Sequence, residues 1–129
     1  MAVGIRERTK EGSAPKPTRF FSNKQEKSVA EAIGGKQTKN SGATPWQKGD
    51  VLTSGSESFL IECKTKTKKS DTITIREDWF EKNRQEMAFQ GKKHQAVVFS
   101  FGPDEENHYI IDEYLFQDLL EYLQSKGEC

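Results

Sequence analysis

The sequence predicts a single α/β domain, and two observations carry that prediction. The chain has 129 residues, which at roughly 100 to 200 residues per domain leaves room for one fold. Its apolar pattern changes between helical and strand periods in the order α-β-β-β-α-β-β-α, which is typical of a mixed sheet covered by helices. We assign residues 21–129 to this domain. Residues 1–20 are basic and nearly free of apolar side chains, so we expect a disordered N-terminal arm there.

The first helix is predicted between two local signals. Ser22 and Gln25 have the spacing of a capping box, so a helix is expected from this point to about Ile33. The glycine pair at 34–35 ends it, because glycine closes a helix in the left-handed conformation without a Cβ clash. The polar segment 36–45 then predicts a short strand or a mobile loop.

A β-hairpin follows and carries the most informative residues. Two strands, at 50–53 and 58–66, flank a cluster of turn-forming residues. A three-residue tip sets a register in which Asp50 lies opposite Glu62, with Cβ atoms roughly 4.5 to 5.5 Å apart. Two like charges this close repel each other, so the pair becomes favourable when a divalent cation is shared between them. Mg²⁺ is the simplest such ion.

The remaining elements complete the sheet and its cover. Residues 77–90 have helical spacing, and Gly91 ends this helix. The face that we expect to be buried carries Trp79, Phe80, Met87 and Ala88. Residues 95–101 form a buried strand and 109–111 its neighbour. The amphipathic pattern at 115–123 predicts a final helix, which we expect to pack on its own sheet.

The charges are distributed unevenly along a chain of zero net charge. Residues 1–69 hold 14 basic and 7 acidic side chains, whereas residues 70–129 hold 6 and 13. A basic first half would attract a polyanion if its charges gather on one face, although solvated charges that cluster by chance fit the same count. No apolar run is long enough for a membrane helix and no signal peptide is recognisable, so we expect a cytoplasmic protein without membrane partners. Two cysteines are too few for a disulfide scaffold, which fits a reducing compartment.

The hairpin residues resemble a known signature. Asp50, followed twelve residues later by Glu62-Cys63-Lys64, resembles the motif of PD-(D/E)XK nucleases. Glu26 in the preceding helix, and Lys39-Asn40-Ser41-Gly42 before the aspartate, resemble the archaeal and phage Holliday junction resolvases of that superfamily. Gly49 stands where the motif has proline. The resemblance implies a restriction-endonuclease-like fold, in which helices flank a mixed β-sheet.

The resemblance also implies an activity and its residues. It points to a Mg²⁺-dependent, structure-selective DNA endonuclease, a Holliday junction resolvase that acts on four-way junctions as a homodimer. Mn²⁺ would substitute for Mg²⁺, no small-molecule cofactor is implied, and the source would be a bacterial or archaeal host or a phage. The implied catalytic residues are Glu26, Asp50, Glu62 and Lys64. The implied metal ligands are Glu26, Asp50, Glu62 and the backbone carbonyl of Cys63, and Lys64 would orient the attacking water or add positive charge beside the phosphate.

Several readings remain open from the residues themselves. Glu31 lies in the same helix as Glu26, and the resemblance favours Glu26 because it lies about eight residues before the glycines. The expected DNA-binding residues are Arg6, Arg8, Lys36, Lys39, Ser41, Lys48, Lys66, Lys68 and Lys69. The alternatives are a related nuclease that acts on ends, flaps or duplex DNA, and a non-catalytic DNA-binding module whose carboxylates are ordinary solvated surface.

Overall fold

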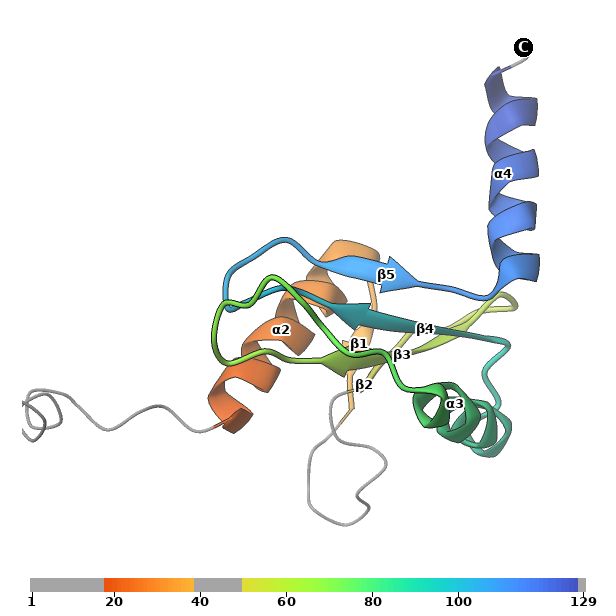
Figure 1. The fold of residues 1–129 in the computed structure, drawn as a ribbon. Coiled ribbons are helices and arrows are strands. Elements are labelled where there is room, and N and C mark those ends of the chain that lie inside the picture. The colour runs from red at the N-terminus through yellow and green to blue at the C-terminus, as the bar shows by residue number, and fades with distance from the viewer. Residues whose placement is uncertain (1–17, 39–49, 128–129) are drawn as a thin grey trace, which may run out of the picture.

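The computed structural model describes residues 18–38 and 50–127 and has the predicted order of elements (Figure 1). In chain order these elements are α2 (Thr18–Ile33), β1 (Lys36–Gln37), β2 (Asp50–Leu52), β3 (Phe59–Lys64), α3 (Glu77–Gln90), β4 (His94–Phe99), β5 (His108–Ile110) and α4 (Glu113–Gly127). The predicted N-terminal arm lies outside the described residues, apart from its last three positions, which open α2.

The five strands form one mixed sheet in the order β1-β2-β3-β4-β5. Strands β3 and β4 are parallel, and every other neighbouring pair is antiparallel. Helix α3 makes the crossover that a parallel pair requires. The prediction of a single α/β domain with a mixed sheet is therefore confirmed. The predicted hairpin register is confirmed as well, because Asp50 pairs directly with Glu62.

The two faces of the sheet have different covers. Side chains alternate along a strand, so Val51 and Ile61 point to the face on which Val29 of α2 packs, and these three residues belong to one fully buried apolar cluster. Helix α3 packs against β3 and β4 on the other face, where Leu60 and Val97 are buried. Asp50 and Glu62 therefore share the α3 side of the hairpin.

Helix α2 begins earlier than expected and ends where expected. It opens at Thr18, so Ser22 lies inside the helix and the predicted capping box is wrong. The sequence places Pro17 directly before Thr18, and proline is tolerated at the start of a helix but not within it. The helix ends at Ile33, and Gly34 follows with a φ of +73°, as the glycine pair predicts.

Helix α3 has the predicted bounds, and Gly91 closes it with a left-handed φ of 68°. Its buried face differs from the predicted one, because Ala88 is exposed whereas Asn83 and Glu86 are buried. The helix is therefore rotated so that polar side chains meet the sheet. This rotation matters because Glu86 comes close to the hairpin carboxylates.

Helix α4 projects away from the sheet (Figure 1), and only its first turn is well packed. Leu115 is buried, but the other apolar residues of this helix are 42 to 61% exposed. The expectation that α4 packs on its own sheet is therefore wrong. Only two residues separate β5 from α4, and side-chain contacts fix the first turn in this direction. Within residues 18–38 and 50–127, no helix is both long and apolar enough to cross a membrane.

Candidate functional site

Two carboxylates, one buried and one half-buried, face each other across the β2–β3 hairpin. Asp50 is 2% exposed, and the Glu62 side chain is 15% exposed. Among the described residues, neither Oδ2 of Asp50 nor Oε1 of Glu62 has a hydrogen-bond partner. Buried polar atoms normally have partners, so these oxygens are open acceptor positions in the protein. Carboxylate oxygens of this kind are the ligands that Mg²⁺ prefers.

The electrostatics of the site are dominated by Asp50. Burial is the largest cause of a raised pKa at Asp50, and together with the nearby charges of Glu86, Glu62 and Glu26 it moves that pKa from 3.8 to about 9. A side-chain hydrogen bond to Glu86 also favours the protonated form of Asp50. At neutral pH and without a cation, Asp50 is therefore held neutral. A bound cation would favour its charged form instead.

Glu86 is a site residue that sequence reasoning missed. It lies on α3 and is buried against the hairpin, and burial is the main cause that raises its own pKa. The hydrogen bond with Asp50 acts in the opposite direction and lowers the pKa of Glu86. A usable signal was present in the sequence, because Asn83 and Glu86 follow Trp79 at i+4 and i+7 on one helical stripe. Two polar residues on a stripe that also carries tryptophan indicate a polar site under the helix.

Lys64 is held beside the carboxylate pair by two contacts. Its Nζ lies 2.7 Å from Oε2 of Glu62, and the same ammonium lies 4.5 Å from the centre of the Trp79 ring. The tryptophan comes from the first turn of α3, so this helix positions the lysine as well as Glu86. The strand places Glu62 and Lys64 two residues apart, on the same face. A positive charge is therefore held beside Glu62, whose other carboxylate oxygen has no partner among the described residues.

Glu26 is the buried glutamate of α2, whereas Glu31 on the same helix is exposed. Oε1 of Glu26 accepts a hydrogen bond of 3.4 Å from Gln37 of β1. Its charge contributes to the raised pKa of Asp50, after the larger contributions of Glu86 and Glu62. Of the two helix glutamates, Glu26 is thus the one that the fold turns toward the hairpin.

The part of the chain that the structure describes holds no group of three or more carboxylate, imidazole or thiol side chains arranged to ligate one metal ion. Asp50 and Glu62 form a facing pair, and Glu26 remains a predicted third ligand. The Cys63 thiol is buried in the apolar cluster on the α2 face, and burial raises its pKa. The thiol therefore stays protonated and points away from the pair, so only the backbone carbonyl of Cys63 remains a candidate ligand.

The predicted DNA-binding residues fall into two groups. Lys36 is exposed on β1, Lys66 is half-buried just after β3, and Lys68 and Lys69 are exposed farther along the same segment, with Nζ of Lys69 3.6 Å from Oε1 of Glu105. Arg6, Arg8, Lys39, Ser41 and Lys48 lie outside the described residues. The lysines that can be placed therefore lie on an edge strand of the sheet and just beyond the strand that carries Glu62.

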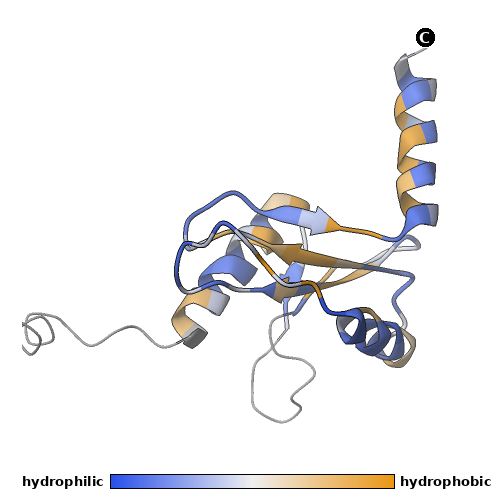
Figure 2. Ribbon diagram, in the orientation of Figure 1, coloured by the Kyte–Doolittle hydropathy of each residue, from blue (hydrophilic) through white to orange (hydrophobic). Residues whose placement is uncertain are grey.

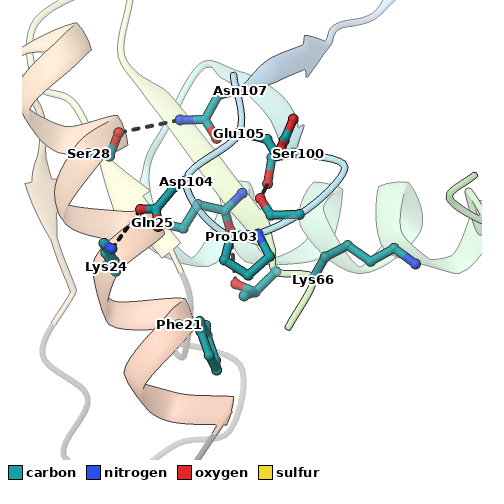
Figure 3. Close-up of a pocket in the computed structure, with 12 residues that line it drawn as sticks. Phe21, Lys24, Gln25, Ser28, Lys66, Ser100, Pro103, Asp104, Glu105 and Asn107 are labelled. Carbon is teal, nitrogen blue, oxygen red and sulfur yellow. Dashed lines mark hydrogen bonds and ion pairs between the residues drawn. The ribbon is translucent and has the colours of Figure 1, made fainter. Parts of the chain in front are cut away.

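A polar cavity of about 360 Å³ lies between α2, the end of β3 and the loop that joins β4 to β5 (Figure 3). Gln25 lines it and accepts a hydrogen bond of 2.9 Å from Oγ1 of Thr65. Lys24 lies 2.6 Å from Asp104 across the cavity, and Lys66 directs its ammonium away from α2. The cavity is lined by Thr65 and Lys66, the two residues that follow Lys64, and by none of Asp50, Glu62 and Lys64.

The arrangement combines open oxygen ligands, a fixed ammonium group and nearby basic residues. This combination suits the binding of a divalent cation together with a phosphate group. No family model matches the chain, and neither curated proteins nor solved structures gave a match.

Proposed function

We propose that this protein is a Mg²⁺-dependent DNA endonuclease with the restriction-endonuclease-like fold of PD-(D/E)XK nucleases, and that it resolves four-way DNA junctions. The observation that carries the proposal is the facing pair of Asp50 and Glu62 with Lys64 fixed beside it. Without a cation Asp50 must be kept protonated beside Glu62, and this costs free energy that a bound cation would remove. The order of helix glutamate, hairpin aspartate and Glu-Cys-Lys strand supports the assignment to this superfamily.

The residues present fit a Mg²⁺ ion. Asp50 and Glu62 each offer a buried oxygen without a partner among the described residues, and the backbone carbonyl of Cys63 lies between Glu62 and Lys64 in the chain. We expect these three groups to hold the ion, with Glu26 as a further ligand and with Mn²⁺ as a substitute. When bound, the ion would activate a water molecule and neutralise charge that develops on the scissile phosphate.

The protein groups around the pair then have distinct roles. Lys64 brings a positive charge to the position where the phosphate would lie, and the ring of Trp79 restricts where that charge can move. Glu86 and the burial under α3 keep Asp50 out of bulk water. Lys66, Lys68 and Lys69 continue from the same strand and would bind neighbouring phosphates.

A four-way junction is the substrate that the resemblance favours. Two opposed strands of a junction are related by approximate two-fold symmetry, so a dimer with two identical sites would cut both. A related enzyme that acts on ends, flaps or duplex DNA would use the same carboxylates. A DNA-binding module would instead retain the basic residues and lack any need for the Asp50–Glu62 pair.

The experiment that tests the proposal is cleavage of labelled four-way junction, flap and linear duplex in Mg²⁺ or Mn²⁺. We expect symmetric nicks in the junction and little cutting of duplex. Glu62→Gln should abolish cutting and leave junction binding intact, whereas Glu106→Gln, on the exposed β4–β5 loop, should cut as the wild type does. Preferred cutting of flap or duplex would move the assignment to another nuclease. Tight binding without cutting in either metal would favour the DNA-binding module.

A further inference from the structure

Helix α4 carries an apolar stripe that residues 18–38 and 50–127 leave uncovered. The exposed residues of this stripe are Phe116, Leu119, Leu120, Tyr122 and Leu123. Their spacing of i, i+3, i+4, i+6 and i+7 places them along one side of the helix, and Figure 2 shows apolar and polar bands alternating around it. A stripe this wide on a helix that stands in solvent is unusual, because large exposed apolar patches mark interaction sites.

The direction of α4 is set at its base. Oη of Tyr114 lies 2.7 Å from Nδ1 of the buried His94, and the other ring nitrogen of His94 lies 2.7 Å from Glu57. Asp112, just before the helix, accepts a hydrogen bond of 3.3 Å from Gln95. These contacts hold the first turn to β4, so the exposed stripe is directed away from its own sheet by the packing of the fold.

An apolar groove of about 370 Å³ opens where α4 leaves the sheet. Its lining includes Phe59, Ile61, Ala96 and Ile111 of the sheet side, and Leu115 and Leu119 of α4 itself. The groove is therefore continuous with the helix stripe through Leu119. Among the described residues, nothing covers the apolar stripe of α4, and nothing fills the groove beside its base.

We propose that a second copy of this chain covers both surfaces, through antiparallel pairing of the two α4 helices about a two-fold axis. In this arrangement the C-terminal half of each α4 lies beside the base of the other, so that its Leu123 reaches the groove near Leu119 of the first copy. The helix has 15 residues, about 22 Å, which is long enough to span from its base to the base of the second copy. In such a two-fold contact, each copy covers the stripe and the groove of the other, and the assembly is closed at two subunits.

Charge and area support the same occupant. Glu113 is in the first turn of α4 and Lys126 in the last turn, so antiparallel pairing places Glu113 of each copy near Lys126 of the other. It also aligns the two helix dipoles in opposite directions, which is favourable. The five stripe residues are 42 to 61% exposed. At roughly 150 to 200 Å² per large side chain, the two helices alone would bury on the order of 1,000 Å², which is the lower limit for a biological interface, and burial of the groove would add to it.

The first test is the mass of the protein in solution, measured by light scattering without metal or DNA, so that it is independent of the proposed activity. The chain has a mass of 14.7 kDa, and we expect twice this value for the wild type. Leu120→Glu combined with Leu123→Glu should give the monomer with unchanged circular dichroism. The matched pair Gln117→Glu and Gln124→Glu adds the same charge to the polar side and should remain dimeric. A monomeric wild type, or a dimer that survives the leucine changes, would overturn the proposal.

The second test addresses the antiparallel alignment. In a Cys129→Ser background, the double variant Phe116→Cys/Leu123→Cys should form a disulfide-linked dimer under mild oxidation, because positions 116 and 123 oppose each other across the two-fold axis. Either cysteine alone should link poorly, as should the pair Gln117→Cys/Gln124→Cys on the polar side. Efficient linking by each single cysteine would indicate parallel helices and would contradict this alignment.

Discussion

Replacing Asp50 by asparagine is expected to stabilise the metal-free protein while it removes a proposed metal ligand. Asp50 is buried beside Glu62 and Glu86, and burial together with these charges raises its pKa from 3.8 to about 9. In the unfolded chain the same group ionises freely near its ordinary pKa. Folding at neutral pH therefore requires Asp50 to take up a proton, and this requirement costs free energy.

The sign and size of the effect follow from linkage. Between about pH 4 and pH 9 the folded state binds more protons at Asp50 than the unfolded state does, so the free energy of unfolding falls as the pH rises through this window. Each pH unit is worth about 1.4 kcal/mol, so the interval from 3.8 to 7 sets a ceiling of about 4 kcal/mol. Water that enters the site lowers this cost, and we expect a gain on the order of 2 kcal/mol for Asp50→Asn at about pH 7.

The assay is urea unfolding in the presence of a chelator, at about pH 4.5, 7 and 8.5. The stability gap between Asp50→Asn and the wild type should be small at the lowest pH and should widen as the pH rises. Asp71→Asn changes an exposed aspartate and should produce no comparable pH-dependent gap. A gap that stays constant with pH, or a variant that is less stable than the wild type at pH 7, would refute the reasoning.

The other predictions concern the metal, the lysine and the helix glutamates. Millimolar Mn²⁺ should raise the melting temperature of the wild type and have little effect on that of Asp50→Asn, as measured by calorimetry, because the ion binds only the folded site; an equal shift in both proteins would argue against the site. Lys64→Met should slow single-turnover cleavage on the order of 100-fold with little loss of junction binding, since it removes charge at the reacting phosphate. Glu26→Gln should lower cleavage far more than Glu31→Gln, because only the first is buried, and equal rates would remove Glu26 from the site. Glu86→Gln should lower the pKa of Asp50, as followed by carboxyl NMR, because it removes a neighbouring negative charge.

The hairpin register could be predicted from sequence because local geometry determines it. In an antiparallel pair, the length of the turn fixes which residues face each other, and the alternation of side chains then fixes the face. The pairing of Asp50 with Glu62 needs no information from the rest of the fold. The two helix ends at Gly34 and Gly91 are local in the same sense, because each requires a left-handed residue.

The rotation of α3, the direction of α4 and the surroundings of Glu26 depend on tertiary packing, which the spacing of apolar residues in the sequence does not specify. The apolar residues of α3 allow more than one rotation on the sheet, and the rotation that occurs buries Asn83 and Glu86. For α4, the amphipathic pattern indicates that one face needs a cover but not which surface provides it. The geometry around Glu26 likewise follows from where α2 crosses β1, which is a contact between distant segments.

The most direct test of the central claim is a calorimetric titration of the DNA-free protein with Mn²⁺. The account predicts saturable binding by the wild type and by Glu106→Gln, and loss of that binding in both Asp50→Asn and Glu62→Gln, since the facing carboxylates are proposed to hold the ion. Binding that persists in both hairpin variants, or a wild type that binds no divalent cation, would contradict the account.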